Sequence, residues 1–124
     1  LATRRATLAF GAGMLAAPAA RAQGRFPERP IRLIVPFAAG GTTDVQLRAM
    51  GEIAARRLGQ PVVVENRTGA GGVLGAQQLL QERPDGHVLS QMPISVFRHP
   101  QMAARPLFNP LEDFTYVIHV TGYL

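Results

Sequence analysis

The chain has 124 residues, of which 47% are hydrophobic and 17% charged, so its composition excludes a disordered protein and allows one small core. It contains no cysteine, which excludes a disulfide framework and a thiolate metal site. The net charge of +5 does not indicate nucleic-acid binding, because its basic residues, all arginines, are scattered along the chain.

The first residues have the form of an export signal. Arg4 and Arg5 precede an apolar run over residues 6–17, and a small-x-small cleavage pattern ends at Ala22. The run is shorter than the roughly 20 apolar residues of a transmembrane helix. We therefore expect residues 1–22 to be a signal peptide, exported by the general secretory or the twin-arginine route; a buried first helix is the alternative.

A strand, a loop and a helix follow. Residues 31–35 form an apolar run that predicts a buried strand, and Pro36 ends it. Residues 37–44 form a loop of small residues. Apolar side chains then recur at helical spacing as far as Gly59, a typical residue for a helix end; they are Leu47, Met50, Ile53, Ala54 and Leu58.

The same order repeats further along the chain. The β-branched run at 62–65 predicts a second strand, and residues 66–72 form a glycine-rich loop. A second helix is indicated by Val73, Ala76, Leu79 and Leu80. Residues 87–91 predict a third strand, which a third loop follows.

The last part of the chain predicts two further elements. Asn109 and Pro110 favour a short helical turn through Asp113, because Asn caps helices and Pro suits their first position. Residues 115–120 predict a fourth strand. Alternating strands and helices indicate an α/β fold with a mainly parallel sheet flanked by helices.

The loops after the strands are the candidate binding site. In open α/β sheets, ligands sit beyond the carboxyl ends of the strands, so these loops should converge. Their glycines let backbone N–H groups approach a ligand, and the helices behind them add partial positive charge. The site should therefore prefer an anion, either a carboxylate or a phosphate; the alternative is that the loops are merely tight turns.

Two nucleotide-binding motifs are not matched. The loop beginning at Gly69 has Leu74 where a dinucleotide fingerprint needs its third glycine, and a phosphate loop needs a lysine, which the chain lacks. Asp44 is interpreted as a helix cap or as a recognition group for a ligand amine or hydroxyl. We expect no cofactor.

No set of residues predicts catalysis. His87, His99 and His119 lack metal-ligand spacing. Ser90 and Ser95 have no nucleophile elbow around them. We expect neither a catalytic group nor a metal site, and the chain is predicted not to be an enzyme.

The order of these motifs resembles that of a known family. The resemblance rests on residues 26–44 (FPERPIRLIVPFAAGGTTD), 58–67 (LGQPVVVENR), 69–72 (GAGG), 84–87 (PDGH) and 109–114 (NPLEDF). It is to the Bug family, the periplasmic receptors of tripartite tricarboxylate transporters. Family members are considerably longer, so residues 23–124 are expected to be a truncated first domain of a periplasmic-binding-protein-like fold.

The resemblance implies a receptor that encloses a di- or tricarboxylate between two hinged domains. It implies a periplasmic monomer that works with membrane transporter subunits, and main-chain N–H groups and waters that hold the ligand. The implied ligand-binding residues are Phe37, Ala39, Gly40, Gly41, Thr42, Thr43, Asp44, Gly69, Ala70, Gly71 and Ser95.

Three alternatives to an intact receptor remain from the sequence. The chain can be a ligand-dependent interaction or signalling protein, since some receptors of this kind signal to membrane sensors. It can be an inactive fragment, because closure around a ligand needs two bodies and a hinge. An enzyme on the same α/β layer is the least favoured, because nothing assembles a catalytic group.

Overall fold

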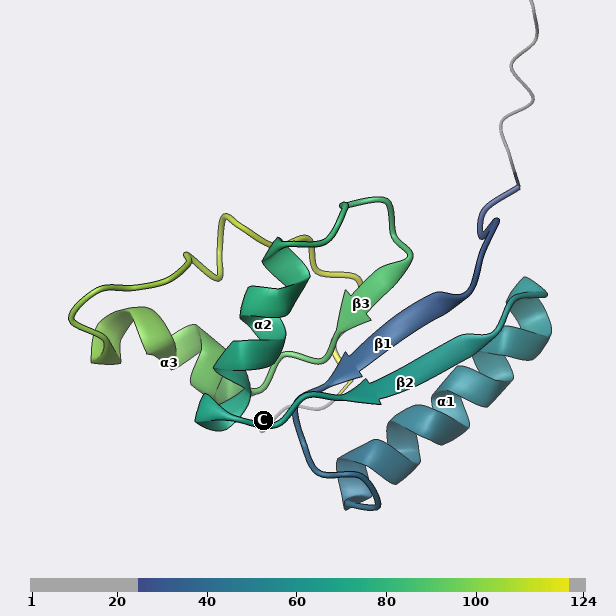
Figure 1. Cartoon of the computed structure of the whole chain (residues 1–124), viewed down its shortest axis with the longest axis horizontal. Coiled ribbons are helices and arrows are strands. Elements are labelled where there is room, and N and C mark those ends of the chain that lie inside the picture. Colours follow the sequence, from purple (N-terminus) through teal and green to yellow (C-terminus); the bar gives the residue numbers. More distant parts are fainter. Residues whose placement is uncertain (1–24, 121–124) are drawn as a thin grey trace, which may run out of the picture.

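The structure, a computed structural model, describes residues 25–120 and forms an α/β layer (Figure 1). The elements are β1 (Ile31–Val35), α1 (Thr42–Leu58), β2 (Val62–Asn66), the short 3-10 helix η1 (Ala70–Gly72), α2 (Val73–Leu80), β3 (Val88–Ser90) and α3 (Ile94–Met102). The predicted signal peptide lies outside the described residues.

The sheet has three parallel strands in the order β2-β1-β3. Ile31 pairs with Val62 at the start of β1, and Leu33 pairs with Leu89 of β3. The central position of β1 explains its nearly continuous apolar sequence, since a parallel strand is covered on both faces. Ile34 and Val35 are fully buried there. The predicted α/β fold with a parallel sheet is confirmed.

Helix α1 packs against β1 and β2 on one face of the sheet (Figure 1). Leu47 is buried, and Gly51 allows close approach because a Cβ there would lie 3.3 Å from Val62. The helix ends as predicted at Gly59, whose φ of 72° is left-handed and whose N–H donates to the carbonyl of Ala55.

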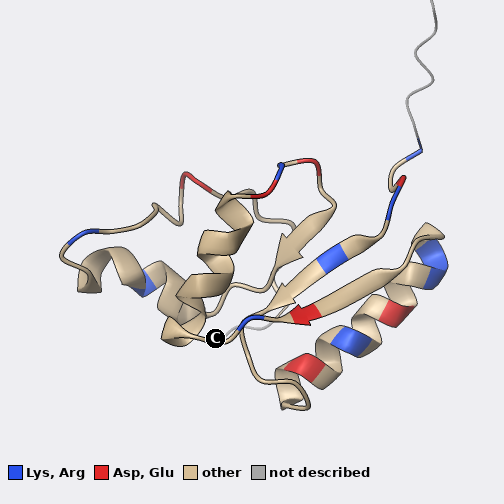
Figure 2. Ribbon diagram, viewed as in Figure 1, with Lys and Arg blue, Asp and Glu red and all other residues tan. Residues whose placement is uncertain are grey.

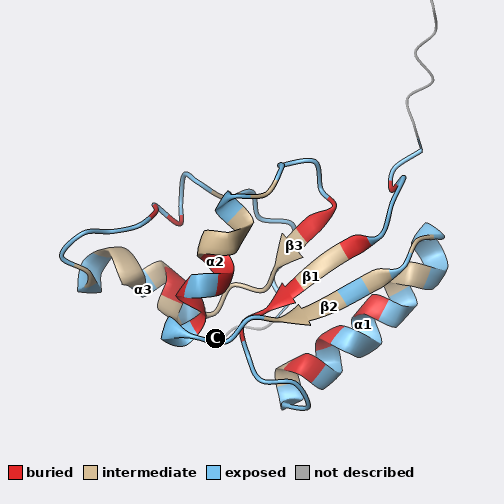
Figure 3. Ribbon diagram, viewed as in Figure 1, coloured by how far each residue is buried: buried red, intermediate tan, exposed pale blue. Residues whose placement is uncertain are grey.

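Helices α2 and α3 form a second small core on the other side of the sheet (Figure 3). Its buried members are Val73, Ala76, Val96 and Phe108, and Met92 and Phe114 pack against them. Gly75 brings α2 close to β1, since a Cβ there would lie 3.3 Å from Ile34. The sheet is therefore covered on both faces.

A half-buried ion-pair cluster joins β1 and β2 to the segment just after α2. Figure 2 marks the charged residues of these segments on the ribbon. Arg32 donates two hydrogen bonds to Glu65, of 2.7 and 2.9 Å, and one of 2.8 Å to Glu82. These bonds raise the pKa of Arg32 and lower the pKa of Glu65. The cluster fixes β1, β2 and α2 relative to one another.

Asp85 and His87 tie the turn before β3 to the start of the sheet. Asp85 accepts from the backbone N–H of His87 and from Arg29, which together lower its pKa to about 2. The buried His87 ring also contacts Phe26 edge-on, with ring centres 4.9 Å apart. His87 is thus a structural residue.

One expectation for the C-terminal part is wrong, and one helix before it was not predicted. Residues 115–120 do not form a fourth strand: they pair with no described strand, and Val117 and Ile118 are 76% and 72% exposed. The loop after β3 leads into helix α3, which the sequence analysis did not predict because Pro93 and Pro100 mask its periodicity. The turn at 109–113 is present, with Asn109 accepting from the N–H of Leu111.

None of the helices between residues 25 and 120 combines the length and the apolar character that crossing a membrane requires.

Candidate functional site

The loops that follow β1, β2 and β3 meet at the carboxyl edge of the sheet (Figure 1). The N–H of Arg67 donates to the carbonyl of Val35, and the N–H of Gln91 donates to that of Ile34. The hydroxyl of Ser95 also donates to the carbonyl of Gly71. The predicted convergence is therefore present: two backbone bonds extend the sheet at this edge, and the Ser95 bond links the second loop to the start of α3.

Gly72 is the point where the three loops touch. A Cβ at this position would lie 2.4 Å from the Pro93 side chain of the third loop and 3.2 Å from Pro36 of the first. Its φ of 98° also lies in the left-handed region that favours glycine. Only glycine therefore lets the second loop pass between the two prolines.

Three helices begin at this edge without a side-chain cap. The N-cap residues are Gly41 for α1, Gly72 for α2 and Pro93 for α3, and none makes a side-chain capping bond. The first N–H groups of a helix have no partner within the helix, and the helix dipole adds partial positive charge there. Three helices therefore begin at this edge, one more than the sequence predicted, although the N–H groups of Gly72 and Val73 at the start of α2 already donate to carbonyls of the second loop.

Asp44 is a buried polar centre behind the first loop. Its carboxylate accepts from the N–H of Gly40 at 2.8 Å, from Arg48 Nε at 2.9 Å and from Asn66 Nδ2 at 2.8 Å. Hydrogen bonds from Arg48, Gly40 and Asn66 together lower its pKa far below its usual value. The side chain is 2% exposed, so in this structure it ties the loop to α1 and β2.

The predicted ligand-binding residues divide by exposure. Asp44 is buried, Thr43 and Ser95 are half-buried, and the others are exposed; these are Phe37, Ala39, Gly40, Gly41, Thr42, Gly69, Ala70 and Gly71. Ala70 has a φ of 46°, in the left-handed region that glycine favours. The structure brings all three segments to one edge, while their role in ligand binding stays a prediction.

Sequence reasoning missed three contributors to this edge. Arg48 follows Asp44 by four residues, a helical spacing that could have indicated the pair. Asn66, at the end of β2, bridges Asp44 and the carbonyl of Phe37, and nothing local in the sequence signals this. The N-terminus of α3 was missed with the helix itself.

The chemistry available at this edge is binding through backbone donors. No cluster of three metal-ligating side chains occurs within residues 25–120. Ser90 donates to the carbonyl of Gln91 and Ser95 to Gly71, so neither hydroxyl donates to a histidine. The arrangement is suited to holding an anion in place.

Comparison with known proteins matches this arrangement to a family of receptors. Residues 46–124 match the model of the tripartite tricarboxylate transporter family receptor. Over 111 residues, the chain is 43% identical to the "UPF0065 protein in gbd 5'region" of Cupriavidus necator, covering 90% of this chain and 34% of that protein.

Two solved structures contain the same fold over most of the chain. The periplasmic binding protein BugD superposes with a TM-score of 0.66 at 40% identity, covering 72% of this chain and 30% of BugD. MatC of Rhodopseudomonas palustris, solved with bound malate, superposes with a TM-score of 0.61 at 38% identity, covering 73% and 31%. The matched part of the chain spans between 22% and 34% of the length of these curated relatives.

Proposed function

Because this chain belongs to the tripartite tricarboxylate transporter receptor family, we propose that it forms the first-domain half of a periplasmic receptor for a small carboxylate. The observation that supports this is the meeting of three helix N-termini at one edge, none of them with a side-chain cap. Backbone donors at such ends bind anions. The proposal assigns residues 1–22 to a signal peptide and residues 23–124 to part of the first domain.

A dicarboxylate is the proposed ligand class. Malate is bound in the structure of MatC, which is 38% identical to this chain over the matched part. We propose that residues 39–43 and 69–71 surround one carboxylate, with Ser95 beside it. The membrane subunits of a transporter are the proposed recipients of the ligand, and the chain is proposed to act as a monomer.

Isothermal titration calorimetry of the full chain with malate, succinate and citrate tests the proposal. At least one of the three should bind saturably, because the three helix ends are already in place. A chain that is folded by circular dichroism but binds none of them would contradict the proposal.

A pair of matched variants then locates the site. Ala39→Asp places a carboxylate among the proposed donors, and it should reduce affinity at least about tenfold through repulsion and competition. Ala104→Asp makes the same change at an exposed position of the C-terminal part and should bind like the wild type. Equal affinities for the two variants would place the ligand elsewhere.

A further inference from the structure

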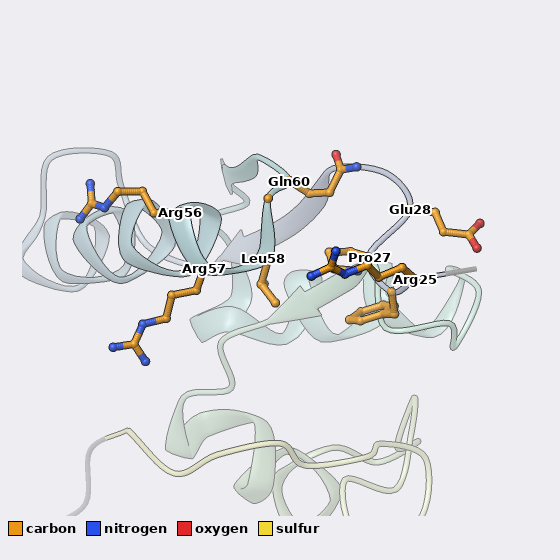
Figure 4. A pocket seen from close by; sticks show the side chains of 9 residues that line it. Arg25, Pro27, Glu28, Arg56, Arg57, Leu58 and Gln60 are labelled. Atoms are coloured by element: carbon orange, nitrogen blue, oxygen red, sulfur yellow. The ribbon is translucent and has the colours of Figure 1, made fainter. Parts of the chain in front are cut away.

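A hollow lies at the opposite, amino edge of the sheet (Figure 4). It has a volume of about 420 Å³ and lies between the segment that precedes β1 and the end of α1. Since both segments lead into the starts of strands, the hollow is separated from the candidate carboxylate site by the length of the sheet. The receptor function proposed above does not use it.

The rim of this hollow is strongly cationic. Arg25, Arg56 and Arg57 line it, against one carboxylate, Glu28. Within residues 25–120 none of the three arginines forms an ion pair, whereas Arg29, Arg32 and Arg48 each do. The dipole of α1 accounts for Arg56 and Arg57 in its last turn, but not for Arg25, which comes from another segment.

Part of the wall of the hollow is apolar and open to solvent. Phe26 is 54% exposed and Leu58 42% exposed, and both line the hollow beside Pro27. Exposed apolar side chains ringed by polar ones are typical of an interaction site. The hollow therefore accepts an apolar group between positive charges.

The directions of the arginines decide between a compact and an extended occupant. Figure 4 shows Arg56 and Arg57 leaving the end of α1 in different directions, with Arg25 on the other side of Leu58. A compact anion cannot contact all three, whereas an extended chain with several carboxylates can. We propose that this edge is a docking site for an acidic peptide segment of another protein, with an apolar side chain inserted beside Phe26 and Leu58.

Fluorescence anisotropy with a short dye-labelled peptide of alternating glutamate and leucine tests the proposal on the full chain. The Arg56→Ala/Arg57→Ala variant should weaken binding about tenfold, because it removes two of the charge contacts. The matched control is Arg83→Ala/Arg105→Ala, which removes the same charge at two exposed positions away from the hollow. The control should change affinity less than about twofold.

A third variant tests the apolar contact. Leu58→Ser should weaken binding of the glutamate–leucine peptide but leave a pure glutamate peptide unaffected, since only the first has a side chain to insert. An equal loss of affinity in the two double-arginine variants would overturn the proposal, because it would indicate that the peptide is attracted by net charge alone. Preferential binding to anionic lipid vesicles would also overturn it. Titration with malate in parallel keeps the result distinct from that of the carboxylate site.

Discussion

The region from Ile31 to Ser95 and the region from residue 103 to 120 contain similar side chains but differ in structure. Val62 and Val64 lie in β2, where their backbones pair with β1. Val117 and Ile118 are equally β-branched, yet they pair with no described strand and are mostly exposed. The difference shows that β propensity describes how well a side chain fits a sheet, and that a strand also needs a partner.

The two regions also differ in how far apart in sequence the partners of their polar contacts lie. In the first, Asp44 joins a loop, a helix and a strand, and Asn66 lies 22 residues further along the chain. In the second, Asn109 bonds to Asp113, and the hydroxyl of Tyr116 donates to the carbonyl of Pro110. Phe108 and Phe114 anchor the second region to the core. Away from these two aromatic residues, substitutions in the first region should therefore cost far more stability.

The largest expected difference is between two isoleucines. Ile34→Ala removes a fully buried side chain from β1 and should lower the free energy of unfolding by about 2–5 kcal/mol. Ile118→Ala makes the same change at a position 72% exposed and should cost less than about 0.5 kcal/mol. Urea unfolding of the two variants measures both, and a large loss in Ile118→Ala would reveal packing of the second region.

The next effect comes from the two aspartates. Asp44→Ala leaves donors from Gly40, Arg48 and Asn66 without their acceptor, so the melting temperature should fall by about 10 °C. Asp113→Ala removes one exposed contact within a turn and should lower it by about 2 °C. Thermal circular dichroism compares them. Similar melting temperatures for the two variants would show that the Asp44 contacts contribute little to stability.

A smaller difference in stability is expected between substitutions at two glycines whose φ angles are left-handed. Gly72→Ala combines an unfavourable φ with a Cβ 2.4 Å from Pro93 and should cost about 2–3 kcal/mol. Gly59→Ala has a similar φ of 72° but open space, so only about 1 kcal/mol should be lost. Urea unfolding measures the difference. Equal losses would mean that the Pro93 loop moves away without cost.

The smallest effect is on acid stability. The pKa of Asp85 falls from 3.8 to about 2 in the folded state, so deprotonated Asp85 favours folding. Its contribution should be complete above about pH 4 and should disappear as the pH falls toward about 2. Melting temperatures between these pH values should therefore fall less steeply in Asp85→Asn than in the wild type. Glu112→Gln, at an exposed position, serves as the control, and identical slopes for Asp85→Asn and wild type would contradict the assignment.

Much of the first region could be predicted from the sequence. The apolar run at 31–35, the helical spacing from Leu47 to Leu58 and the glycine at 59 each specify local structure, because they act through neighbours in the chain. The order of strands and helices also predicted the parallel sheet and the edge at which the loops converge. The family resemblance rested partly on the same residues, within 26–44 and 58–67, and also on residues 109–114 of the second region.

Only the tertiary structure decided how that edge is built and where the chain stays irregular. The contacts of Asp44 with Asn66, the passage of Gly72 between Pro36 and Pro93, and the third helix end at Ile94 join segments far apart in sequence. Residues 115–120 have a strand's composition but no partner among the described residues. Local propensity is set by each residue and its neighbours, whereas pairing and convergence depend on which distant segments the fold brings together.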